Sequence, residues 1–273
     1  MLLAAFAVIE TRSTDPLLPI RVLRSRDRSG AYLITLCIGI ALFGMFFFLT
    51  LFIQDVWGYS PLKTGLAYLP FVPVILATTM LTQQAVTRIG ARPLLAAGAA
   101  ISAGAMFWLS RTTEHSTFAG GMLGPELLLG AGLGPMFVLI FLVGLTKVTS
   151  SDAGVASSLI NVGQQVGGAV GLAILGTVAW STVSGNLHSQ AAATARAGGH
   201  APGASAAALQ ARLYQHALAT GFSRGYLVSA GIMVLAVIIA LAMIRIRRQD
   251  LSGAGAGAEP MAPADDTTSP SRA

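Results

Sequence analysis

Six long apolar runs constrain this chain more than any other feature of its sequence. The first, at 30–53, reads GAYLITLCIGIALFGMFFFLTLFI and contains no charged residue. About 20 apolar residues suffice to cross the hydrocarbon core of a bilayer as a helix, and only helices or closed barrels satisfy every backbone hydrogen bond there. Further runs follow at 65–87, 93–110, 127–146, 155–180 and 226–244. The sequence therefore predicts an all-α membrane protein with a six-helix transmembrane bundle at 29–248.

The segments outside these runs are short or of low complexity. Residues 1–28 join an apolar stub, MLLAAFAVIE, to a basic connector, and we interpret the stub as the end of a truncated helix, with a free N-terminal peptide as the alternative. The segment 181–225, rich in Ala and Gly, is expected to form an external loop with a short helix at 204–219. The tail at 249–273 is expected to be disordered and cytoplasmic because its composition cannot build a core.

The basic residues gather at alternate ends of the expected helices. One set comprises Arg12, Arg21, Arg24, Arg26, Arg28, Arg88, Arg92, Lys147, Arg245, Arg247 and Arg248. Because cytoplasmic loops are enriched in Lys and Arg, we expect a multi-pass protein of the inner or plasma membrane with both termini in the cytoplasm. The net formal charge of +6 thus has a membrane explanation, and no basic stripe of the kind that binds nucleic acid is present.

The polar residues do not form the constellation that an enzyme needs. His115, His188, His200 and His216 lack the spacing of a metal site. The only cysteine, Cys37, lies in the middle of the first run and has no partner for a disulfide. We therefore expect no enzymatic activity, no metal and no cofactor.

The fifth run combines glycine with carboxamide residues, in the stretch DAGVASSLINVGQQVGGAVG at 152–171. At about 100° per residue these residues fall on two adjacent stripes of a helix. The stripes consist of Gly163, Gly167 and Gly171 on one side and of Asn161, Gln164 and Gln165 on the other. A glycine stripe permits a neighbouring helix backbone to approach closely. An unpaired amide in lipid costs up to a few kcal/mol, so the carboxamide stripe faces either another helix or a water-filled cavity.

Three stretches, in this order, resemble a known family of membrane transporters. They are PLLPIRVLRSRDRSGAYL at 16–33, FGMFFFLTLFIQDVWGYSPLKTGLAYLP at 43–70 and DAGVASSLINVGQQVGGAVGLA at 152–173. The loop QQAVTRIGARPLLAAG at 83–98 also matches a glycine-plus-basic pattern of that family, although it lacks the Gly and Asp that often open it. Over about residues 11–248, the chain is similar to the second half of the fourteen-helix drug:proton antiporter branch of the major facilitator superfamily.

This resemblance implies a half-bundle that rocks against a missing N-terminal half around a substrate site at the membrane midplane. It implies proton-coupled export of small amphipathic compounds, with Arg88 and Arg92 as a cytoplasmic gate; anchoring at the membrane surface explains these arginines equally well. Candidates for the cavity wall are Phe43, Phe47, Asn161, Gln164 and Gln165. The alternative hypothesis is a truncated membrane fragment, or an interaction subunit, that does not transport.

A proton-coupled transporter needs a carboxylate, and few are available in the apolar runs. The family's membrane-embedded acidic residues belong to its first half, and the first, second, third, fifth and sixth runs of this chain contain no Asp or Glu. Glu126, expected at the outer edge of the fourth run, is the candidate for coupling. A glutamate that only complements the helix dipole is the alternative interpretation.

Overall fold

The computed structural model describes residues 24–113, 115–146, 148–149, 151–196 and 203–245. Its elements are α3 (Arg26–Leu51), the π-helix η1 (Phe52–Val56), α4 (Pro61–Ala67), α5 (Phe71–Ile89), α6 (Ala91–Leu109), the π-helix η2 (Phe118–Met122), α7 (Leu123–Leu145), α8 (Ala153–Arg196) and α9 (Gly203–Met243). Six helical segments are long and apolar enough to cross a membrane, and the described residues contain no strand. The expected all-α bundle of six transmembrane helices is therefore confirmed. The stub at 1–10 and the tail at 249–273 lie outside the described residues.

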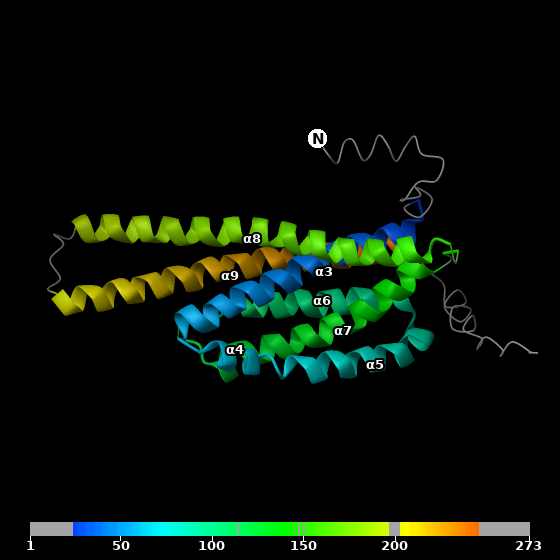
Figure 1. Ribbon diagram of the computed structural model, residues 1–273, viewed down its shortest axis with the longest axis horizontal. Helices are drawn as coiled ribbons and strands as arrows, with labels where there is room; N and C mark the ends of the chain where they lie inside the picture. Colours follow the sequence, from blue (N-terminus) through cyan, green and yellow to red (C-terminus); the bar gives the residue numbers. More distant parts are fainter. Residues whose placement is uncertain (1–23, 114, 147, 150, 197–202, 246–273) are drawn as a thin grey trace, which may run out of the picture.

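The six segments lie side by side and alternate in direction, with α3 in the middle of the bundle (Figure 1). Helix α3 packs against α7, α8 and α9, whereas α5 packs mainly against α7. Accordingly α3 contributes many fully buried side chains, among them Ile34, Ile38 and Phe48. Much of α5 is exposed, because few neighbours cover it. Helix α3 is thus the structural centre, and α5 is held on one side only.

The second transmembrane segment is broken between α4 and α5, where the sequence predicts kinks at Pro70 and Pro73. Across residues 68–71, hereafter the α4–α5 junction, the backbone forms turns with i→i−3 bonds, such as Tyr68 N–H to Gly65 O at 3.2 Å and Phe71 N–H to Tyr68 O at 3.2 Å. Proline has no N–H to continue the helical ladder and its ring clashes with the preceding turn. The prolines therefore explain the break, which divides the second transmembrane segment into the two helices α4 and α5.

The segment 181–225, expected as a loop, is largely helical, and that prediction is wrong. Helix α8 continues to Arg196 and α9 already begins at Gly203. At about 1.5 Å per residue, helices of 44 and 41 residues exceed the hydrocarbon core of about 30 Å, and the pair extends past the other helices in Figure 1. Alanine favours the helix. In addition, the two helices pack closely here, because a Cβ at Gly221 would lie 2.7 Å from the Ala179 carbonyl oxygen.

Gly90 allows α5 and α6 to follow one another almost without a loop. It ends α5 and precedes the first residue of α6, with φ at +94°. L-residues with side chains rarely adopt this backbone region. The glycine of the loop at 83–98 is therefore required by the sharp reversal that places Arg88 and Arg92 at one end of the bundle.

Alternation of the helices gathers the described basic residues in two groups. Arg26, Arg88, Arg92 and Arg245 belong to the end of the bundle where α3 begins and α9 ends, whereas Lys63, Arg111, Arg212 and Arg224 lie away from that end. Ser189 lies in α8, 36 residues after its first residue, Ala153, and therefore also far from the first group. By the positive-inside rule we expect the first end to face the cytoplasm.

In a Cys37→Ala background, we expect a membrane-impermeant maleimide to label Ser189→Cys in intact cells and to leave Thr87→Cys unlabelled. Both positions are exposed and helical, so they differ mainly in the side of the membrane they occupy. Mass spectrometry of the purified variants measures the labelled fraction, and permeabilised cells show that Thr87→Cys can react. Labelling of Thr87→Cys alone in intact cells would reverse the predicted orientation.

Candidate functional site

The glycine stripe of α8 lies against α3. A Cβ at Gly167 would lie 3.0 Å from the carbonyl carbon of Leu36 and would overlap its oxygen, and a Cβ at Gly171 would lie 2.7 Å from the Cα of Ile40. Gly163 lies next to Thr35, whose methyl group would be 3.3 Å from such a Cβ. The two backbones therefore approach each other at positions four residues apart, as small residues at that spacing permit.

The carboxamide stripe lies beside this contact on the outer surface of the chain. Asn161 and Gln165 are exposed and Gln164 is half-buried. The Asn161 amide donates to the Ser157 carbonyl of its own helix at 3.2 Å. Phe43 of α3 lies next to Gly168, which is one turn of α8 beyond Gln164. A Cβ at Gly168 would lie 2.7 Å from the Phe43 ring. The cavity-wall candidates thus share one side of the α3–α8 pair, where amides and an aromatic ring are both accessible.

Phe47 belongs to the same exposed stripe of α3 as Phe43, one turn along the helix. Each of the two side chains is 45% exposed, which is high for residues of the central helix. Phe47 also makes an edge contact with Phe48, whose ring is buried against Phe222 of α9. Aromatic side chains placed in this way can pack against either lipid or an apolar solute.

The two arginines proposed as a gate occupy different environments. The Arg92 guanidinium donates to the Leu241 carbonyl at 2.5 Å, and that of Arg26 donates to the Ala242 carbonyl at 3.0 Å. Both therefore satisfy the last carbonyls of α9, a favourable place for a cation. Arg88 is exposed in the last turn of α5. In this arrangement Arg92 joins helices α6 and α9 of the same bundle.

Glu126 lies in the first turn of α7, as the sequence predicts, but the transmembrane segment that contains this helix starts earlier than expected. The segment begins at Phe118, because η2 runs directly into α7 and extends the helix by about one turn. Glu126 is consequently about two turns inside the segment. Glycines before Pro125 interrupt the apolar run, so the sequence predicts that the run begins at 127, whereas the structural segment begins at Phe118.

The Glu126 carboxylate is buried without a partner. The residue is 2% exposed, and neither carboxylate oxygen has a hydrogen-bond partner among the described residues. A crevice between α3, α6 and α7 is lined by Met45, Leu49, Ala105, Met106, Leu109, Pro125, Glu126 and Leu129. Apart from Glu126 these residues are apolar, and they pack too closely to admit a water molecule. Such an isolated acid is rare in native proteins, where more than about nine in ten buried polar groups are paired.

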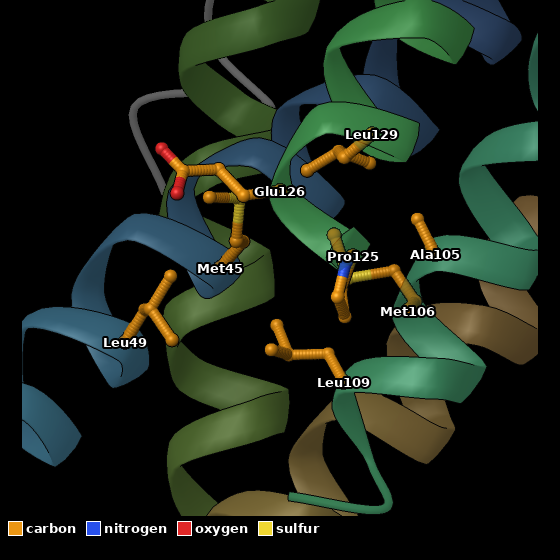
Figure 2. Close-up of a pocket in the computed structure, with 8 residues that line it drawn as sticks. All are labelled: Met45, Leu49, Ala105, Met106, Leu109, Pro125, Glu126 and Leu129. Atoms are coloured by element: carbon orange, nitrogen blue, oxygen red, sulfur yellow. The ribbon is translucent and has the colours of Figure 1, made fainter. Parts of the chain in front are cut away.

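The side chain of Glu126 reaches past this crevice. Figure 2 shows it next to Met45, with the carboxylate turned away from Met106 and Leu109. Tyr68 of the α4–α5 junction packs on Phe46, the α3 residue that follows Met45. The acid therefore lies against α3 and α6, and the α4–α5 junction contacts the same stretch of α3.

Two tyrosines of the transmembrane segments, Tyr68 and Tyr226, were not singled out from the sequence. The Tyr68 hydroxyl shares a hydrogen bond with Thr50 Oγ1 at 2.9 Å, and it also lies 3.4 Å from the Phe46 carbonyl oxygen. The Tyr226 hydroxyl of α9 is buried and has no hydrogen-bond partner among the described residues. A tyrosine inside an apolar run is a signal that could have been followed, because its hydroxyl needs a partner there. No three described His, Cys, Asp or Glu side chains are placed to hold a metal ion.

Comparison with protein families matches residues 8–172 to the Major Facilitator Superfamily. The chain is 33% identical over 190 residues to the puromycin resistance protein pur8 of Streptomyces alboniger, covering 68% of this chain and 38% of that protein. It is 39% identical over 186 residues to the cephamycin export protein CmcT of Amycolatopsis lactamdurans, covering 67% and 38%. The tetracenomycin C resistance and export protein of Streptomyces glaucescens is 31% identical over 180 residues, covering 66% and 33%. The match thus spans between about a third and two fifths of the length of these relatives.

Proposed function

The chain belongs to the major facilitator superfamily, and from this premise we propose that it is the C-terminal half of a proton-coupled exporter of small amphipathic compounds. The superfamily consists of transporters rather than enzymes, and the structure is that of a multi-pass membrane protein. In such transporters two six-helix bundles rock around a substrate site near the membrane midplane. The relatives named for antibiotic resistance and export support the direction of transport.

The observation that carries the proposal is the buried carboxylate of Glu126, which has no hydrogen-bond partner in the part of the chain that the structure describes. An ionised carboxylate without a partner in an apolar surrounding is costly, so such residues inside membrane segments are retained where they serve ion or proton movement. We infer that Glu126 holds a proton while it is buried in this way and releases it when water reaches the site. The acid lies on α7, next to the central helix α3, where movement of the bundle alters its surroundings.

The proposed substrate surface is the exposed side of the α3–α8 pair. Asn161, Gln164 and Gln165 supply hydrogen-bonding groups, and Phe43 and Phe47 supply aromatic area. A surface of this mixed kind suits compounds with both apolar and polar parts. We propose that it faces the cavity between this half and the N-terminal half, in the inner or plasma membrane.

The test is a fusion of this chain behind the N-terminal half of the cephamycin export protein, reconstituted in vesicles with an imposed pH gradient. We expect dye efflux that an uncoupler abolishes, and a return to the background rate when the fusion carries Glu126→Gln, because the amide cannot release a proton. This chain alone should give no such efflux, since alternating access needs two halves.

Two results would contradict the proposal. A folded fusion that moves no dye would favour the alternative, a membrane fragment or interaction subunit without transport. Uncoupler-sensitive efflux that persists in Glu126→Gln would remove Glu126 from the coupling mechanism. Asp55→Asn is the matched control, because this exposed acid at the end of the first segment is outside the buried site and should leave efflux unchanged.

A further inference from the structure

The α4–α5 junction covers the face of α7 on which Glu126 lies. Phe71, the first residue of α5, packs on Gly130, where a Cβ would lie 3.3 Å from the Phe71 carbonyl oxygen and from its ring. Gly130 follows Glu126 by four residues, so the two positions share one face of α7. Tyr68, at the other end of the junction, packs on Phe46, which follows the crevice residue Met45 in α3. The junction therefore contacts both α7, one turn from the buried acid, and the part of α3 that lines its crevice.

This junction is the least firmly held of the elements around Glu126. The other two, α3 and α6, contribute buried crevice residues such as Met45 and Met106 and are packed against several helices each. In contrast α4 is mostly exposed, with only Thr64 and Ala67 buried. The break at Pro70 also removes the continuous helical ladder that would transmit stiffness from α5 to α4. A movement that admits water to Glu126 requires the least disruption at this point.

The Tyr68 side chain fastens the junction to the central helix. Its hydroxyl bonds Thr50 Oγ1 at 2.9 Å, and its ring packs on Phe46 with the ring centroids 5.0 Å apart. Phe46 also makes an edge contact with Phe71, at 5.8 Å between centroids, so both ends of the junction meet the same ring of α3. The Tyr68 hydroxyl thus makes two polar contacts with α3, a short hydrogen bond with Thr50 Oγ1 and a longer one to the Phe46 carbonyl oxygen, within an otherwise apolar contact.

We propose that Tyr68 is a positioning residue that controls the access of water to Glu126 through its hydrogen bond with Thr50. While the bond is intact, the junction stays on α3 and α7 and the carboxyl remains dry. When it breaks, α4 moves away about the break at Pro70, and the face of α7 that carries Glu126 becomes accessible. This inference rests on the proposed function for its purpose, since proton exchange needs such access, but the access can be measured without transport.

The experiment measures the reactivity of a thiol at the site. In the full chain with Cys37→Ala and Glu126→Cys, purified in lipid nanodiscs, we follow modification by a charged methanethiosulfonate reagent by mass spectrometry. Addition of Tyr68→Phe removes only the hydroxyl and keeps the ring on Phe46. We expect the modification rate to rise about threefold to tenfold, the factor by which loss of one net hydrogen bond shifts an opening equilibrium. Thr50→Val should give a similar rise, and Thr50→Ser, which keeps a hydroxyl, should restore a slow rate.

Tyr32→Phe is the matched control, because its hydroxyl lies 3.5 Å from the Gly144 carbonyl oxygen on α7, well along the helix from Glu126. It should leave the rate at position 126 unchanged. An unchanged rate in both Tyr68→Phe and Thr50→Val overturns the proposal, as does an equal rise in Tyr32→Phe, which would indicate general loosening. If Tyr68→Phe does not fold, the comparison of Thr50→Val with Thr50→Ser tests the proposal by itself. Because no efflux is measured, a failed transport assay and a failed access assay remain distinguishable.

Discussion

Replacing Gly167 by leucine is expected to lower the free energy of unfolding by about 3 kcal/mol or more, at the upper end of the usual cost of overpacking. The new side chain would meet the backbone of α3 at Leu36, with its Cβ 3.0 Å from the carbonyl carbon. Backbone cannot rotate aside as a flexible side chain does, so α8 would have to move away from the central helix. The loss of contact would extend to Gly163 and Gly171 on the same stripe.

The chain contains its own reporter for this measurement. Cys37 is its single cysteine and is 4% exposed, so a fluorogenic maleimide reacts with it only when the bundle opens. Thermal unfolding of the detergent-solubilised variants gives the change in melting temperature. Gly176→Leu, on the same helix but with no atom within 4 Å of its Cβ position, is the control and should be neutral or slightly stabilising. Equal melting temperatures for the two variants would mean that α3 and α8 do not touch at Gly167.

The second large effect has the opposite sign: Glu126→Met is expected to raise the free energy of unfolding by about 1–3 kcal/mol, the usual penalty of a buried polar group without a partner. Methionine has a similar length, and Met45 and Met106 already line the adjacent crevice. The substitution removes two buried oxygens that have no hydrogen-bond partner in the described chain. A stabilising mutation that abolishes transport is what a functional acid in an apolar site predicts.

The same Cys37 assay measures this gain, and Glu126→Gln provides the comparison. The amide is also polar and unpartnered, so it should recover only part of the stability that methionine provides. Destabilisation by Glu126→Met would show that the carboxyl has a stabilising partner in the membrane. In that case the carboxyl would be a structural group, and the inference that it carries a proton would lose its support.

Some features of the structure could be predicted from local sequence because the physical cause is local. A bilayer offers no partners to backbone groups, so the length and polarity of each run such as 30–53 suffice to predict a helix. The absence of an N–H in Pro70 likewise predicts the break between α4 and α5. The spacing of Gly163, Gly167 and Gly171 predicts a flat stripe on α8, whatever helix lies against it.

Other features depend on neighbours that are distant in the sequence. The Ala-rich segment after Trp180 reads as a loop, yet α8 and α9 support each other there through contacts such as Gly221 with Ala179. The sequence does not predict what Arg92 binds. In the structure its guanidinium donates to the Leu241 carbonyl near the end of α9.

The sequence by itself determined the six membrane crossings, because each crossing must satisfy its own backbone within one continuous apolar run. Only the tertiary structure decided that Glu126 is buried, because side chains from α3 and α6 lie against it. It also decided the partner of Tyr68, since a break in one segment brings its hydroxyl to Thr50 on another. Burial and hydrogen bonding of a polar side chain are properties of all the helices that meet there, and no single run encodes them.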